Sequence, residues 1–266
     1  MLRTRILTGV VLAVIVAVSV LLLETWQASA VFGIFWLIGA SEWARLARLA
    51  GIARVAYSAL FALLVIVVIL FGVPDVAFAA VLWLTAAIWI VAFGFVLRYP
   101  SPLTDSAKAV TGLVVLAAAW LSFYALHGNA QNGPGLIMTG LVIVWSADIG
   151  AYFVGRSLGR RPLAPRVSPK KTWEGVGGGV VAASVTGAIA ARILDLPLLL
   201  LVPTAAAMAL ISVVGDLSVS LLKRSAGLKD TGVLLPGHGG ILDRFDGVTA
   251  ALPFFVLGLQ FAHVLD

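Results

Sequence analysis

Runs of about twenty apolar residues recur along the chain from one end to the other, and short polar segments separate them. The hydrocarbon core of a bilayer needs about 20 apolar residues for each helix that crosses it. The runs therefore predict an all-α, polytopic membrane protein that forms one integral-membrane domain over residues 1–266. The nine predicted transmembrane helices are 6–23, 28–44, 57–73, 76–97, 109–126, 136–154, 176–193, 197–222 and 248–265.

The composition excludes a soluble globular domain. Hydrophobic residues make up 61% of the chain and charged residues 11%, whereas soluble domains average about 45–50% and about 25%. A core of this length could not bury that much apolar surface, so lipid must cover it. The chain has no cysteine, which excludes disulfides and thiolate metal sites.

The first apolar run has some features of a cleaved signal peptide. Arg3 and Arg5 precede it, and Ala28-Ser29-Ala30 resembles a small-residue cleavage site. However, the run from Ile6 to Leu23 is longer than the roughly 7–15 residues of a signal peptide. We therefore expect a retained helix.

The distribution of basic residues predicts the orientation. Lys and Arg accumulate in cytoplasmic loops. With the N-terminus in the cytoplasm and nine spans, every one of the 18 Lys and Arg residues except Arg192 falls on the inner side. The net charge of +6 is thus a topology signal that also favours anionic lipid headgroups, and it does not indicate a nucleic-acid partner.

Two of the predicted cytoplasmic loops, 155–175 and 223–247, carry unusual polar sequences. In the first, Ser168 followed by Pro169 predicts the start of a helix, with Ser168 as N-cap. Helix N-termini favour phosphate, and Lys170 and Lys171 point to the same ligand. The alternative is that the basic residues of this loop only anchor the topology. Next, Gly175 and Gly179 are four apart, as in closely packed membrane helices.

Asp148 and Asp216 lie within predicted spans, where charges are costly and usually functional. Each lies six residues before the end of its span, which predicts the same depth below the cytoplasmic surface. Two carboxylates at one depth would repel each other, and a shared cation would relieve that repulsion.

The stretch 223–247 continues this polar surface. Asp216, Ser220 and Lys223 share one helical face, and Asp243 and Asp246 share another if the last helix begins early. Asp and Ser oxygens are hard ligands suited to Mg²⁺. The alternative is that Asp216 forms a buried ion pair with Lys223, Arg224 or Arg244. His238 lies among glycines, and the sequence leaves open whether it is functional or merely solvated.

Three segments carry recognisable motifs. The longest reads SLLKR-x4-KD-x-G-x2-LP-x-HGG-x-LDRFD over 220–246. The others are SADIGAYFVGR over 146–156 and SPKKTWEG over 168–175. Together they resemble the phosphatidate cytidylyltransferase, or CDP-diglyceride synthase, family, and Gly215-Asp216-Leu217 also fits the family pattern. The resemblance is strong over 145–247, within predicted catalytic helices and loops 136–266. Residues 1–130 match only as hydrophobic helices.

This resemblance implies condensation of CTP with phosphatidic acid, giving CDP-diacylglycerol and pyrophosphate in phospholipid biosynthesis. It further implies Mg²⁺, with a second metal ion left open, a homodimer, and a site on the cytoplasmic face of a bacterial inner membrane. The expected catalytic residues are Asp216, Lys223, Arg224, Asp243 and His238. The expected phosphate-binding residues are Ser168, Lys170, Lys171, Ser220, Lys229 and Arg244. The expected metal ligands are Asp216 and Asp243, then Asp246 and Asp148.

The sequence departs from the family pattern at two positions. Ile149 stands where Thr or Ser is usual, which weakens the case for Asp148, and Gly247 stands where Ser is common. Two alternative functions stay open. One is a cytidylyltransferase for another lipid phosphate, such as an ether-linked acceptor. The other is a cation-coupled transporter, although transporters bind near the bilayer midplane and these polar groups cluster at one face.

Overall fold

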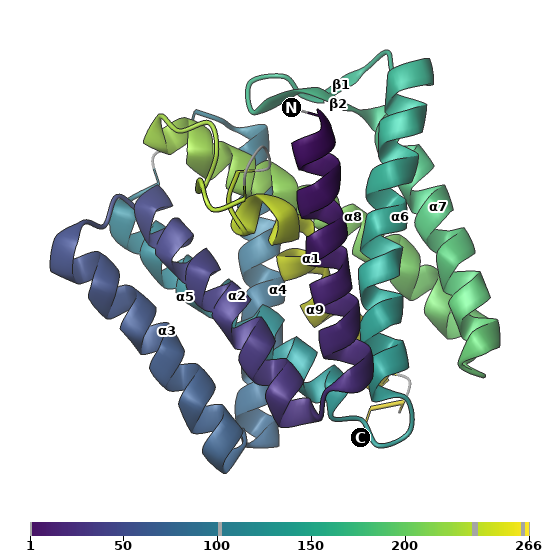
Figure 1. Cartoon of the computed structure of the whole chain (residues 1–266). Coiled ribbons are helices and arrows are strands. Elements are labelled where there is room, and N and C mark those ends of the chain that lie inside the picture. The colour runs from purple at the N-terminus through teal and green to yellow at the C-terminus, as the bar shows by residue number, and fades with distance from the viewer. Residues whose placement is uncertain (1, 101–102, 236–238, 262–263, 266) are drawn as a thin grey trace.

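The computed structural model describes residues 2–100, 103–235, 239–261 and 264–265, with side chains from Thr8 onward. Within these ranges the chain forms nine α-helices and one two-stranded hairpin (Figure 1). The helices are α1 (Leu2–Leu22), α2 (Thr25–Leu46), α3 (Gly51–Phe71), α4 (Asp75–Leu97), α5 (Asp105–His127), α6 (Gly133–Leu158), α7 (Trp173–Ile193), α8 (Leu198–Ala226) and α9 (Leu242–Phe261). The antiparallel hairpin joins β1 (Pro162–Ala164) to β2 (Ser168–Thr172).

Each predicted span corresponds to one of these helices, so the all-α prediction is confirmed. Six of the described helices, α3 to α8, are long and apolar enough to cross a membrane. Large apolar side chains such as Leu70 and Val91 are 67% and 57% exposed on the outside of the bundle. Exposed apolar surface of this kind is stable in lipid but not in water. The protein is a multi-pass membrane protein, and the count of nine spans stays a prediction.

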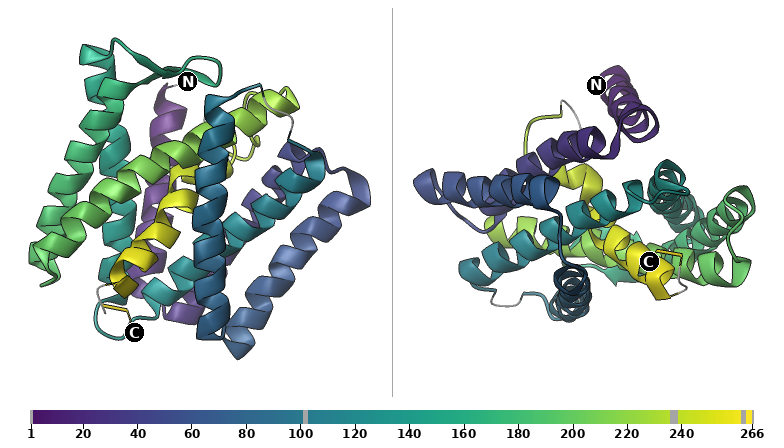
Figure 2. Two further views of the ribbon diagram at one scale, coloured as in Figure 1. Left: turned by 180° about the vertical axis from the view of Figure 1, so that it is seen from behind. Right: turned by 90° about the horizontal axis from the view of Figure 1, so that it is seen from below.

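The helices alternate in direction (Figures 1 and 2). As a result the β-hairpin, the segment after α8 and the beginning of α1 lie at one end of the bundle, and the C-terminus lies at the other. The two polar loops singled out from the sequence therefore meet at the same end.

Local signals explain where several helices begin and end. The Thr104 hydroxyl accepts a hydrogen bond from the Ala107 N–H at 3.2 Å and caps the start of α5. At the C-terminal end of α8, Gly227 has a φ of 71°, the left-handed conformation that ends helices. Pro203 and Pro253 lie inside α8 and α9, as membrane helices tolerate.

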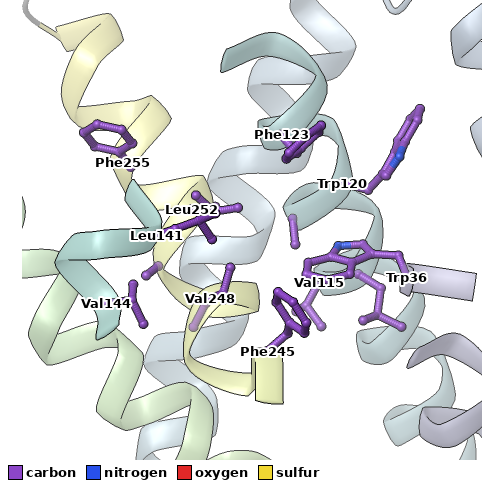
Figure 3. Packing of buried hydrophobic residues seen from close by; sticks show 14 of the residues in the cluster. Trp36, Val115, Trp120, Phe123, Leu141, Val144, Phe245, Val248, Leu252 and Phe255 are labelled. Carbon is purple, nitrogen blue, oxygen red and sulfur yellow. The ribbon is translucent and has the colours of Figure 1, made fainter. Parts of the chain in front are cut away.

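Helix α9 contributes many buried side chains to the core, and Phe245, Leu252 and Phe255 are among those drawn in Figure 3. Leu252 and Phe255 are at most 1% exposed. At the start of α9, the Phe245 ring packs edge-on against Trp36 of α2 at 5.3 Å between centroids. The start of α9, which carries the candidate carboxylates Asp243 and Asp246, is thus fixed by apolar packing against α2.

The packing of α6 against α7 depends on small residues. A Cβ atom added at Gly179 would lie 2.8 Å from the Ala147 carbonyl oxygen, and one at Gly175 would lie 2.9 Å from that of Ala151. These distances confirm that the two glycines allow close helix packing. This contact fixes α6, and with it Asp148, beside the hairpin.

Candidate active site

The segment between α6 and α7 folds differently from the prediction. Ser168 and Pro169 do not start a helix but lie in strand β2, and α7 begins at Trp173. The Thr172 hydroxyl is the N-cap, since it accepts the Gly175 N–H at 3.1 Å. The prediction was wrong because Thr172 is also a capping residue, while a proline is compatible with a strand that needs no N–H donor there.

A second interaction closes this segment. The Glu174 carboxylate accepts hydrogen bonds from the backbone N–H groups of Arg160 and Arg161, at 3.1 and 3.2 Å. At the start of α7 the Gly175 N–H is thus occupied by Thr172, and Glu174 ties the backbone before the hairpin to the first turn of the helix. Lys170 and Lys171 therefore lie on a β-hairpin beside the bundle and not on a helix N-terminus.

The hairpin and the helices around it enclose a pocket of about 640 Å³, which we call the main pocket. It is lined by both predicted intramembrane acids, by several basic residues and by hydroxyl groups. These polar residues are Asp148, Tyr152, Arg156, Ser168, Lys170, Lys171, Thr172 and Asp216. Asp148 and Asp216 thus face one cavity, as their matched depth predicts.

Asp216 has two polar partners at the edge of this pocket. Its Oδ2 forms an ion pair with Lys171 Nζ at 2.6 Å, and its Oδ1 accepts the Ser220 hydroxyl at 3.3 Å. The second contact confirms that Asp216 and Ser220 share a face of α8. The sequence anticipated an ion pair with Lys223, Arg224 or Arg244, but the partner shown here comes from the hairpin.

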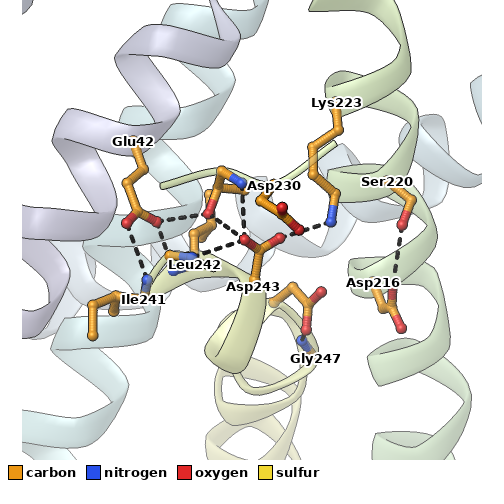
Figure 4. A network of polar contacts seen from close by, with 12 residues as sticks. Glu42, Asp216, Ser220, Lys223, Asp230, Ile241, Leu242, Asp243 and Gly247 are labelled. Carbon is orange, nitrogen blue, oxygen red and sulfur yellow. Dashed lines mark hydrogen bonds and ion pairs between the residues drawn. The ribbon is translucent and has the colours of Figure 1, made fainter. Parts of the chain in front are cut away.

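Lys223 instead bonds to Asp243 in the first turn of α9 (Figure 4). The distance from Nζ to Oδ1 is 2.7 Å, and the Asp243 side chain is 4% exposed. Its Oδ2 accepts the backbone N–H groups of Thr231 and Gly240, at 2.8 and 2.9 Å, and lies 3.0 Å from the Thr231 hydroxyl. Both oxygens of Asp243 are therefore engaged by protein donors.

These contacts determine the ionisation of Asp243, which precedes the predicted span 248–265. Burial alone would raise the pKa of the Asp243 carboxyl. The hydrogen bonds from Lys223, Gly240 and Thr231 outweigh burial and hold that pKa below its ordinary value. Asp243 is thus a carboxylate at neutral pH.

Asp246 lies one turn further along α9 and is partly buried. Its Oδ1 accepts the Gly247 N–H at 2.8 Å. Electrostatic repulsion links Asp216 with both Asp246 and Asp148, which come from α9 and α6. Three carboxylates from three helices therefore lie close enough to interact electrostatically. Among the described residues, however, no three acidic or imidazole groups are placed so that they could hold one metal ion together.

A smaller pocket of about 200 Å³ adjoins the main pocket and shares Ser168 and Lys170 with it. The polar residues that the structure describes in its lining are basic or carry hydroxyl groups, and none of them is acidic. These residues are Ser168, Lys170, Ser220, Lys223, Arg224 and Lys229. The structure thus brings together six of the residues that the sequence assigned to phosphate binding or catalysis.

Among the described residues, three predicted site residues line neither pocket, namely Asp243, Asp246 and Arg244. Arg244 is exposed on the first turn of α9 and attracts Asp148 electrostatically. His238, with Pro236 and Gly237, lies outside the described residues, so its role stays a prediction.

Sequence reasoning misses Glu42, which is 5% exposed on α2. Its Oε1 accepts the Ile241 N–H at 3.0 Å, and its Oε2 accepts the Leu242 N–H and the Thr231 hydroxyl, each at 2.8 Å. The signal that identifies it is a carboxylate within the predicted span 28–44, the criterion that selects Asp148 and Asp216.

Comparison with known proteins supports the resemblance carried by the motifs. The model of the cytidylyltransferase family matches residues 3–262. A phosphatidate cytidylyltransferase of Pseudomonas aeruginosa is 43% identical over 262 residues, which is 96% of each chain. The enzyme of the same name from Haemophilus influenzae is 40% identical over 63% of this chain and 64% of its own. That of Bacillus subtilis is 42% identical over 56% and 58%. The chain therefore belongs to the cytidylyltransferase family.

Proposed function

We propose that this protein transfers the cytidylyl group of CTP to phosphatidic acid, giving CDP-diacylglycerol and pyrophosphate. The observation that carries the proposal is the pair of adjoining pockets, one with acids and bases and one with bases and hydroxyls, in a chain 43% identical to a phosphatidate cytidylyltransferase. Ligand pockets typically measure about 300–1,000 Å³. The main pocket, at about 640 Å³, has room for a nucleotide.

The reaction brings two polyanions together, so positive charge is the first requirement. Lys170 lies on the boundary of both pockets, while Lys171 lines the main pocket and Arg224 and Lys229 line the smaller one. Ammonium and guanidinium groups neutralise phosphate oxygens and stabilise the charge that develops on the leaving group. These residues lower the repulsion between the substrates.

The nucleophile is the phosphate of the lipid. A phosphate monoester has its second pKa near 6, so phosphatidic acid at pH 7 already carries an attacking oxyanion. This oxygen forms a bond to the α-phosphorus of CTP, while the bond from that phosphorus to the oxygen bridging the β-phosphorus breaks and pyrophosphate leaves. No side chain has to remove a proton from the nucleophile.

Some of the carboxylates predicted as metal ligands are suited to a divalent cation. Asp148, Asp216 and Asp246 offer hard oxygen donors, the type that Mg²⁺ prefers. These residues would hold Mg²⁺, which would supply additional charge neutralisation at the triphosphate. Asp243 fits less well than Asp216. Both carboxylates have protein partners on each oxygen, but Asp243 is only 4% exposed and lines neither pocket, whereas Asp216 is 35% exposed and lines the main pocket. The role of Asp243 as a metal ligand stays a prediction.

The surroundings of the site follow from the topology. We propose that the end of the bundle with the hairpin faces the cytoplasm of a bacterial inner membrane, because the basic residues gather there. Lipid substrate then reaches the pockets from the inner leaflet. A homodimer remains part of this proposal on the strength of the family resemblance.

The proposal is tested with purified protein in detergent, by measuring pyrophosphate release with phosphatidic acid and each of the four ribonucleoside triphosphates. We expect release with CTP, dependence on Mg²⁺, and background rates with the other three nucleotides. Diacylglycerol, which lacks the phosphate, is the matched control and should give no release. Equal rates with all four nucleotides, or release without a lipid phosphate, would contradict the proposal.

A further inference from the structure

Glu42 connects the N-terminal helices to the segment between α8 and α9. It lies near the C-terminal end of α2, and its carboxylate accepts three hydrogen bonds from Thr231, Ile241 and Leu242 (Figure 4). Two of these donors are backbone N–H groups at the start of α9, which have no acceptor within the helix. Glu42 therefore caps α9 from another helix.

Two glycines leave space for this carboxylate. A Cβ atom at Gly232 would overlap Glu42 Oε1, and one at Gly240 would overlap both carboxylate oxygens. Gly232 and Gly240 are both buried. The segment thus surrounds Glu42 closely, and nothing larger than glycine fits at either position while the carboxylate stays in place.

Thr231 connects Glu42 to the candidate site. Its hydroxyl donates to Glu42 Oε2 at 2.8 Å, and its N–H donates to Asp243 Oδ2 at 2.8 Å. Asp243 in turn bonds to Lys223, which lines the smaller pocket. Glu42 itself lines neither pocket.

Other contacts join the same end of α2 to this region. The guanidinium group of Arg48 donates to the Ser225 carbonyl at 2.8 Å, and that of Arg45 to the Asp230 carbonyl at 3.4 Å. Both hydrogen bonds are exposed, and in each the acceptor is a backbone carbonyl group. Glu42 is the buried member of the set and the one that reaches the Asp243 network.

We propose that Glu42 is a positioning residue for cytidylyl transfer. It fixes residues 231–242 on α2 and, through Thr231, holds Asp243 and Lys223 in the orientation that the reaction requires. This inference rests on the proposed function. Because Glu42 does not contact the pockets, its replacement should slow turnover without weakening substrate binding.

The test is Glu42→Gln in the full-length protein. A glutamine keeps the shape of the side chain but has one acceptor oxygen, so its amide group would face either the Ile241 N–H or the Leu242 N–H. We expect kcat to fall about 10- to 100-fold, as for a displacement of catalytic groups by about 1 Å. The KM values for CTP and phosphatidic acid should stay within about twofold, since Glu42 only orients the groups. Glu24→Gln, the same change at the other end of α2, is the matched control and should leave kcat unchanged.

A merely structural role is separated by a second set of variants. Rates are expressed per mole of protein that elutes as one folded species and unfolds cooperatively. Thr231→Val removes the hydroxyl link, and the double variant with Glu42→Gln should be no slower than the slower single variant. Gly232→Ala, which displaces the Glu42 carboxylate without changing it, should show the same loss of kcat.

The outcomes distinguish this inference from the proposed function. If the wild type does not use CTP and phosphatidic acid, the proposed function fails. If the wild type is active and Glu42→Gln retains its kcat per folded protein, or if the effects of the two single variants simply multiply, the positioning role is wrong. Should Glu42→Gln not fold, Thr231→Val and Gly232→Ala decide, and wild-type kcat in both would overturn the inference.

Discussion

Lys171 and Asp216 form an ion pair with 2.6 Å between Nζ and Oδ2, and it joins the β-hairpin to the eighth helix. The two side chains are 26% and 35% exposed, and ion pairs at such exposure contribute little to stability. Both residues line the main pocket. The pair therefore matters mainly for the site, where it holds a cation and a carboxylate side by side before phosphates arrive.

Replacement of Asp216 by Asn should abolish most of the activity. The change removes the negative charge that faces Asp148 and Asp246 and leaves Lys171 without its partner. We expect turnover to fall about 100-fold or more, as when a preorganised electrostatic group is lost. Incorporation of labelled CTP into lipid, measured across Mg²⁺ concentrations, gives the rate. Asp75→Asn, at the far end of α4, is the control, and near wild-type turnover in Asp216→Asn would refute its role.

Two basic residues of the smaller pocket, Arg224 and Lys229, should determine substrate affinity. Both side chains line it, and none of the lining residues within the described part of the chain is acidic. Arg224→Gln and Lys229→Gln should each raise the KM of one phosphate substrate about tenfold, the loss of one charge-assisted hydrogen bond. Steady-state kinetics with CTP and phosphatidic acid varied in turn shows which substrate is affected. Arg192→Gln, at the C-terminal end of α7, is the control and should change neither KM. Unchanged KM values in both Arg224→Gln and Lys229→Gln would exclude a phosphate site in this pocket.

The Asp243 network predicts a pH dependence of stability. The pKa of Asp243 is lowered in the folded protein by Lys223, Gly240 and Thr231, against the effect of burial. A carboxyl group with a lowered pKa stabilises the fold above its unfolded pKa, about 3.9, and this contribution is lost as the pH falls through the folded value. The melting temperature of Asp243→Asn should therefore be below that of the wild type at pH 7, and the difference should shrink below about pH 4. A constant difference at every pH would show that the charge of Asp243 is not responsible.

Two neighbouring glycines of α7 should respond in opposite ways to alanine. A Cβ at Gly179 would lie 2.8 Å from the Ala147 carbonyl oxygen, whereas one at Gly177 would meet no atom within 4 Å. Gly179→Ala should destabilise the protein by about 1–3 kcal/mol through overpacking. Gly177→Ala should stabilise it by about 0.5–1 kcal/mol through helix propensity. Thermal unfolding in one detergent measures both, and equal effects would contradict the close packing of α6 on α7.

The lengths of the apolar runs predict the helices, because each transmembrane helix must match the thickness of a bilayer. The same reasoning predicts that Asp148 and Asp216 face one cavity, since depth follows directly from position along a helix. It fails at Ser168-Pro169, where two adjacent capping signals compete and the Thr172 hydroxyl forms the cap. A local sequence pattern does not contain the pairing of two strands that decides this competition.

Contacts between distant parts of the chain are beyond such reasoning. Glu42 and Thr231 are 189 positions apart, yet their side chains bond at 2.8 Å. Lys171 pairs with Asp216, and Lys223 pairs with Asp243. These pairings likewise depend on how the hairpin, α8 and α9 pack together. Charge and depth predict which residues gather at the site, and helix packing determines which of them pair.

Cytidylyl transfer is tested most directly by the position of a radioactive label in CTP. The wild-type protein is incubated with phosphatidic acid, Mg²⁺ and CTP labelled at either the α- or the γ-phosphate, and the lipid is extracted. Attack at the α-phosphorus predicts that the α-label enters the lipid and that the γ-label leaves as pyrophosphate. Transfer of the γ-label to the lipid, or of neither label, would contradict this account.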